Sequence, residues 1–169
     1  MTGEITRWTD LRRLTEARVA LGRAGNGLPT AAHLDFQEAH ARARDAVWSA
    51  LDATTLGIEG DVRHVASDAP DRRTYLLRPD LGRRLRAEDR AALAAEPARG
   101  TVALVVADGL CAAGVQSQAA ALVDALRAAM PDAGPVIVAQ QARVALGDDI
   151  GEALQAAAVV MIIGERPGL

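Results

Sequence analysis

Polar residues follow three apolar runs in the second half of the sequence, within the segments ADGLCA, AQQARVALGDD and GERPGL. Carboxylates, amides and guanidinium groups in such loops can bind a ligand through hydrogen bonds, and a cysteine thiolate can act as a nucleophile. These residues, with the glycines and the valine between them, are Asp108, Gly109, Cys111, Gln140, Gln141, Arg143, Val144, Asp148, Gly164, Glu165 and Arg166. They indicate a binding site built from three separate loops.

The first of these loops does not contain a common nucleotide-binding motif. GLCAAG has the two outer glycines of a phosphate-binding loop, but it lacks the Gly-Lys-Ser/Thr that completes that motif. No G-x-G-x-x-G follows the apolar run either. Cys111 stands at a predicted helix N-terminus, but no histidine is placed to activate it as a nucleophile. The loop therefore argues against both a standard nucleotide site and a cysteine nucleophile.

Two further groups of polar residues have a structural explanation. His33 and His40 are two helical turns apart, with Gln37 on the same helix face, which is typical of a solvated surface and not of metal ligands. Asp148 and Asp149 begin a predicted helix, where carboxylates interact favourably with the helix dipole. We therefore assign neither metal ligands nor catalytic residues to this chain.

The elements that position the three loops are clear from the apolar pattern. Apolar runs of strand length at 101–109, 135–140 and 158–164 alternate with helical stretches at 111–130 and 147–157. Strands that are apolar on both faces favour a parallel sheet covered by helices on both sides, so we predict an α/β fold with a Rossmann-like β-α-β-α-β unit. In such sheets ligands bind at the carboxyl ends of the strands, where the three loops should meet.

The first half of the sequence predicts mainly helices. We expect one helix over 8–25, with Thr9 as its cap, and a second, longer one from Thr30 to about residue 52. Between 54 and 79 short β-like runs predict two strands or extended segments, and 81–96 predicts one broken or two short helices. A turn at 97–100 suggests a boundary between a helical and mixed region, 1–97, and the Rossmann-like region, 98–169.

Composition narrows the class of protein. The 169 residues suffice for one domain with a helical appendage, and half of them are hydrophobic. A formal net charge of −3 and 2% aromatic residues argue against a nucleic-acid partner. No apolar run reaches the roughly 20 residues needed to span a membrane. A single cysteine excludes an intrachain disulfide and fits a reducing compartment, so we expect a cytoplasmic protein.

Several strings, in order and along nearly the whole chain, resemble one enzyme family. The strings LRRLTEARVALGRAGNGLPT, HARARDAV, RPDLGRRL, VVADGL, RVALGDDIGE and IGERPGL resemble the small subunit of adenosylcobalamin-dependent ethanolamine ammonia-lyase. The resemblance implies radical conversion of ethanolamine to acetaldehyde and ammonia by a barrel-shaped large catalytic subunit. The small subunit would cover part of the cobalamin at the interface of a higher hetero-oligomer, and it would be inactive alone.

The resemblance also implies site residues and a location. Family positions that contact cobalamin match Val144 and Glu165, both in the predicted strand-end loops. A carboxylate such as Glu165 can accept N–H groups from the amide side chains of cobalamin, while Val144 can pack against the macrocycle. The family pattern continues beyond GERPGL to a further contacting cysteine, so we expect a C-terminally truncated chain. Some members reside in a bacterial microcompartment, which is an alternative location.

Two other functions remain open from the residues alone. The chain could be a stand-alone Rossmann-like module that binds a small molecule or a nucleotide at the same strand ends, although the phosphate-binding glycines are missing. It could also be a purely structural partner that stabilises a large subunit without contacting the cofactor.

Overall fold

A computed structural model describes residues 8–15 and 17–165. The chain forms two compact units, Met1–Arg42 and Ala43–Leu169. In the first, a 3₁₀ helix, η1 (Trp8–Arg13), is followed by irregular chain and then by helix α1 (Thr30–Trp48), which runs on into the second unit. The long second helix is confirmed. The first is wrong beyond Arg13, because the backbone turns through positive φ at Ala20 and Gly22.

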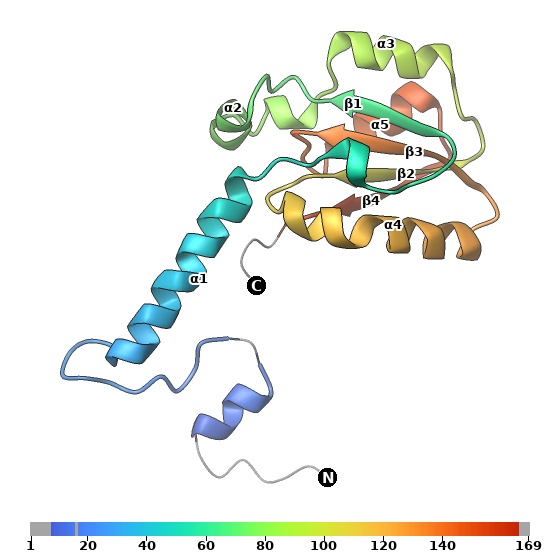
Figure 1. Ribbon diagram of the computed structural model, residues 1–169. Coiled ribbons are helices and arrows are strands. Elements are labelled where there is room, and N and C mark those ends of the chain that lie inside the picture. Colours follow the sequence, from blue (N-terminus) through green and yellow to red (C-terminus); the bar gives the residue numbers. More distant parts are fainter. Residues whose placement is uncertain (1–7, 16, 166–169) are drawn as a thin grey trace. The chain divides into compact units, whose positions relative to one another are not determined.

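The second unit is a four-stranded parallel sheet with helices on both faces (Figure 1). The elements, in chain order, are η2 (Ala53–Thr55), β1 (Val62–Ala66), α2 (Arg72–Leu77), η3 (Leu81–Arg83), α3 (Ala87–Ala95), β2 (Val102–Ala107), α4 (Ala112–Ala129), β3 (Ala133–Gln140), α5 (Leu146–Leu154) and β4 (Ala158–Ile163). The strand order is β1-β3-β2-β4. The predicted β-α-β-α-β unit is confirmed as β2-α4-β3-α5-β4.

The central strands are buried on both faces, as their uninterrupted apolar sequence predicted. Leu104 and Val136 face one cluster, which α4 covers with an apolar stripe at helical spacing. Val105 and Ile137 face the other cluster, which α5 and Leu93 of α3 cover. Figure 1 shows α4 on one side of the sheet and α3 and α5 on the other. Two layers of helix therefore hold the strand ends in fixed positions.

The segment between the long N-terminal helix and β2 differs from its prediction in two ways. One of the expected strands is present as β1, and it pairs with β3 in the same sheet. The second expected strand is wrong: its residues form the short helix α2, which the Asp71 carboxylate caps by accepting the N–H of Thr74 at 2.7 Å. Of the two expectations for 81–96, one broken helix or two short ones, the structure has the second, as η3 and α3.

β1 lies in the same sheet as the later strands, within the unit Ala43–Leu169. The expected division of roles, with cobalamin contact confined to 98–169, stays a prediction. No helix in the described residues is both long enough and apolar enough to cross a bilayer.

The two edge strands of the sheet differ in the contacts made by their outward-facing backbone groups. Beside β1, the backbone N–H of Ala66 donates to the Asp89 carboxylate at 2.8 Å, and the Ala66 carbonyl accepts the N–H of Arg86 at 3.1 Å. On the opposite side, β4 pairs only with β2 within the part of the chain that the structure describes. The residues of β4 are apolar, and all but Ala158 are half-buried.

Candidate functional site

The carboxyl ends of all four strands lie at one edge of the sheet, because the strands are parallel. The loops after them are directly bonded to each other: the Asp108 carboxylate accepts the backbone N–H groups of Gln141 at 2.9 Å and Ala142 at 3.0 Å. The Ser67 hydroxyl, after β1, donates to the Gln141 carbonyl at 2.7 Å. The sequence-based expectation that separate loops converge at one edge is confirmed.

The loop after β2 packs closely on the end of β4. The backbone N–H of Cys111 donates to the carbonyl of Gly164 at 2.9 Å, and that of Leu110 donates to the same oxygen. A Cβ atom on Gly109, whose φ is +54°, would lie 2.3 Å from this oxygen. Only glycine fits there, and the contact fixes the backbone directly before Glu165.

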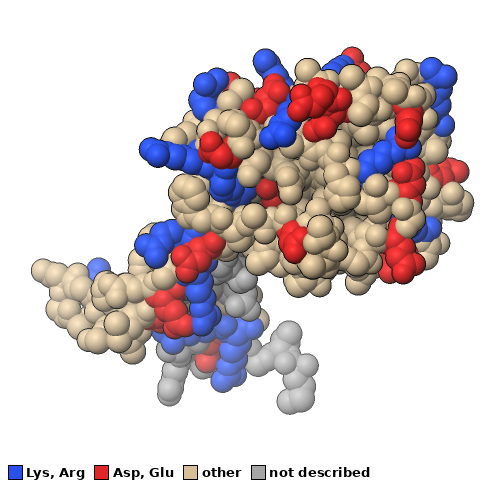
Figure 2. All heavy atoms as spheres, turned by 45° about the horizontal axis from the view of Figure 1, so that its top comes forward, with Lys and Arg blue, Asp and Glu red and all other residues tan. Residues whose placement is uncertain are grey.

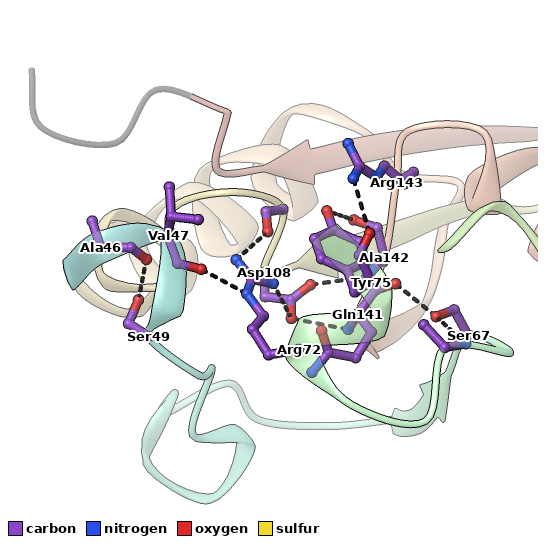
Figure 3. Close-up of polar contacts among 12 residues, drawn as sticks. Ala46, Val47, Ser49, Ser67, Arg72, Tyr75, Asp108, Gln141, Ala142 and Arg143 are labelled. Atoms are coloured by element: carbon purple, nitrogen blue, oxygen red, sulfur yellow. Dashed lines mark hydrogen bonds and ion pairs between the residues drawn. The ribbon is translucent and has the colours of Figure 1, made fainter. Parts of the chain in front are cut away.

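Beneath these loops lies a buried polar cluster centred on Asp108, whose side chain is 2% exposed (Figure 3). Arg72, from the first turn of α2, forms an ion pair with Asp108 at 3.3 Å and donates to the carbonyls of Gly109 and Val47 at 2.8 and 2.7 Å. Burial raises the pKa of the Asp108 carboxyl, while the N–H bonds of Ala142 and Gln141, and then Arg72, oppose that rise.

Tyr75 links this cluster to the loop after β3. Its ring is fully buried, and its hydroxyl donates to the carbonyl of Ala142 at 3.0 Å. The guanidinium groups of Arg72 and Arg143 lie over the ring, 4.7 and 4.5 Å from its centroid. Burial raises the pKa of Tyr75 to about 12, against the opposing effect of Arg143. The phenol is therefore neutral, and it serves as a donor to the loop.

Arg143 is held in place from three directions. Its backbone N–H donates to the carbonyl of Gly82 at 2.8 Å, and its Nη2 donates to the carbonyl of Tyr75 at 3.0 Å. A Cβ on Gly82 would lie 2.8 Å from Cγ of Arg143 and 3.0 Å from the ring of Tyr75. The Nε of Arg143 is buried and has no hydrogen-bond partner among the described residues. The loop that carries Val144 is thus rigidly placed.

Val144 and Glu165 line the same hollow at this edge of the sheet. The hollow has a volume of about 420 Å³, and we call it the strand-end hollow; its lining residues are Arg83, Arg143, Val144, Ala145, Asp148 and Glu165. Val144 is 57% exposed, so its side chain is not part of the core. Glu165 is exposed too, and it forms no ion pair with Arg143 in the described part of the chain.

The other sequence candidates are placed differently. Asp108, Gly109, Gly164 and Cys111 belong to the supporting contacts beneath the loops, and Arg166 lies outside the described residues. Sequence reasoning missed Arg72, Tyr75, Gly82 and Arg83 as parts of the site. One signal was available: Tyr75 is the only tyrosine, and it stands beside the unusual string RPDLGRRL.

The arrangement can bind a neutral, polar ligand. Two guanidinium groups and two carboxylates offer hydrogen-bond donors and acceptors, and an exposed valine lines the same hollow. Acidic and basic side chains are also interspersed over the face of the molecule drawn in Figure 2. Among the described residues, no three His, Cys, Asp or Glu side chains gather as metal ligands would.

Comparison with known proteins gives a consistent result. The family model for "Ethanolamine ammonia-lyase light chain (EutC)" matches residues 5–169. The chain is 50% identical to the ethanolamine ammonia-lyase small subunit of Xanthomonas campestris pv. campestris over 182 residues, covering 96% of this chain and 64% of that protein. It is 51% identical to the small subunit of Azotobacter vinelandii, covering 96% of this chain and 65% of the relative. The chain thus spans less than two thirds of the length of these curated relatives.

Proposed function

This chain belongs to the ethanolamine ammonia-lyase small-subunit family, and from that premise we propose that it binds a large catalytic subunit and helps to hold adenosylcobalamin between the two chains. The observation that supports the proposal is the strand-end hollow, which brings Val144 and Glu165 to one surface. The two residues are far apart in sequence, and each had been matched separately to a cobalamin-contacting position.

The residues of the hollow fit the chemistry of a corrin. The rim of a cobalamin carries amide side chains, each with an N–H donor and a carbonyl acceptor, around an apolar macrocycle. Glu165 can accept an amide N–H, Arg83 can donate to an amide carbonyl, and the exposed Val144 can pack on the ring. A hollow of about 420 Å³ suits one edge of such a molecule and not the whole of it, so a second chain has to cover the rest.

The chain's own contribution is binding and orientation. Adenosylcobalamin, when bound, supplies the cobalt–carbon bond whose homolysis starts the radical conversion of ethanolamine to acetaldehyde and ammonia. The loop of Val144 is fixed by Asp108 and Tyr75, and Gly164, directly before Glu165, is fixed by the backbone N–H of Cys111. Such rigid placement reduces the entropy that is lost when a ligand is bound. We assign no catalytic residue to this chain.

The test is co-expression of this chain with a large subunit of ethanolamine ammonia-lyase. We expect the two chains to co-purify and the complex to bind cobalamin, measured by equilibrium dialysis from the absorbance of the corrin. Glu165→Ala should weaken cobalamin binding by about tenfold or more, because a hydrogen bond to a charged group contributes roughly 1.5–3 kcal/mol. The matched control is Glu59→Ala, which removes an exposed glutamate from the loop before β1.

Each outcome discriminates between functions. A complex that forms but binds no cobalamin would show a purely structural partner. Full affinity in Glu165→Ala would exclude Glu165 from the site, and lyase activity from this chain alone would overturn the proposed role. A cytoplasmic or microcompartment location stays a prediction from the sequence.

A further inference from the structure

We propose that the strand-end hollow selects the intact amides of a corrin, with Asp148 accepting one amide N–H and Glu165 another. This inference rests on the proposed function, and it names the chemical groups that the site distinguishes. A corrin in which a facing amide has been hydrolysed to a carboxylate would then bind less tightly.

Asp148 and its neighbour Asp149 have different roles, although they are adjacent in sequence. Asp149 is engaged within the fold: its Oδ2 accepts the backbone N–H of Leu85 at 2.7 Å, and its carboxylate forms an ion pair with Arg90. Asp148 is exposed and lines the hollow. The fold therefore engages the carboxylate of Asp149 and leaves that of Asp148 at the surface of the hollow.

The charge of the hollow favours a neutral ligand. Arg83 and Arg143 contribute two positive charges, and Asp148 and Glu165 contribute two negative charges, so the formal charges of the lining cancel. The guanidinium of Arg143 already donates to the carbonyl of Tyr75 and lies over its ring. Among the described lining residues, an anionic ligand would meet two carboxylates and one guanidinium, Arg83, that has no partner within the fold, whereas a primary amide can donate to the carboxylates and accept from Arg83.

The preference for an intact amide follows from what hydrolysis does to that group of the ligand. An amide N–H that donates to a carboxylate becomes, on hydrolysis, an oxygen of a second carboxylate at the same place. The hydrogen bond is then lost and two like charges face each other. Replacing Asp148 or Glu165 by its amide removes the repulsion, because the new side chain can donate to the ligand's carboxylate.

The experiment uses the complex of this chain with a large subunit. Cyanocobalamin is compared with its three propionamide-hydrolysed monocarboxylic acids by equilibrium dialysis. In the wild-type complex at least one acid should bind about tenfold more weakly than the parent corrin. Asp148→Asn and Glu165→Gln should each reduce this difference in affinity between one of the acids and cyanocobalamin to about threefold or less. Asp124→Asn, at an exposed position on α4, is the matched control. It should leave the affinity of each acid relative to cyanocobalamin unchanged.

The result separates this inference from the proposed function. If the affinity of each acid relative to cyanocobalamin is the same in the wild type and in both amide variants, the proposed preference for intact amides is wrong. Binding of cyanocobalamin itself would still support the proposed function. Loss of all corrin binding in the wild-type complex would contradict both. Thermal unfolding of each complex checks that Asp148→Asn folds normally, and Asp148→Ser serves as a second variant that also lacks the charge.

Discussion

The guanidinium of Arg72 lies 3.3 Å from the carboxylate of Asp108, and both side chains are almost excluded from water, at 11% and 2% exposure. The same Arg72 reaches the carbonyls of Val47 and Gly109, so one side chain joins the end of α1 to the loop after β2. Asp108 in turn holds the loop after β3. The Arg72–Asp108 pair therefore connects the end of α1, the loop after β2 and the loop after β3.

Arg72→Met should destabilise the protein by about 3–5 kcal/mol, because it leaves the Asp108 carboxylate buried without its counter-charge. Urea unfolding followed by circular dichroism would measure the loss. Arg78→Met is the matched control: Arg78 pairs with Asp80 at the exposed surface, so its removal should hardly change the unfolding midpoint. Similar losses in the two variants would show that the buried pair contributes no more than a surface pair.

Tyr75 should lose its proton only together with the folded structure. Its pKa is raised from 10.0 to about 12 in the fold, so between these values the unfolded chain releases a proton that the folded chain retains. Stability should thus be unaffected by this group below pH 10, and fall as the pH rises towards 12. Because the chain has one tyrosine, tyrosinate absorbance reports on it directly. In Tyr75→Phe this contribution to the pH dependence should vanish; tyrosinate formation near pH 10 with intact secondary structure would contradict the prediction.

Gly82→Ala should destabilise the protein by about 1–3 kcal/mol, because the added methyl group would overlap Cγ of Arg143 and the ring of Tyr75. Gly114→Ala is the comparison: it lies within α4, where the new Cβ meets only the sulfur of Cys111 at 3.4 Å. Alanine favours helix over glycine by about 0.5–1 kcal/mol, so this variant should be neutral or more stable. Thermal unfolding of both variants checks the difference, and equal midpoints would refute the close packing at Gly82.

The positions of β2, β3 and β4 could be predicted from the sequence because their signal is local. Each is a short apolar run followed by polar residues and glycine, and parallel pairing then places their carboxyl ends together. The place of β1 beside β3 could not be predicted, because that pairing joins residues more than 70 positions apart, such as Val62 and Val136. No local pattern encodes a partner at that distance.

The run around Tyr75 shows how a local pattern can mislead. Its residues Thr74 and Tyr75 favour strands, yet the segment folds as α2, which Asp71 caps and in which Tyr75 is buried. Tyr75 is thereby directed under the strand ends. Val144 and Glu165 could be proposed because family positions matched them, whereas Arg72 and Gly82 act through packing partners that only the folded chain brings near.

The unequal borders of the sheet have a consequence for self-association. At β1 the backbone N–H and carbonyl of Ala66 are already bonded to Asp89 and Arg86, whereas β4 consists of uncharged, apolar residues. An incoming strand would therefore find no free backbone groups at Ala66, so edge-to-edge pairing is disfavoured at the β1 side of the sheet.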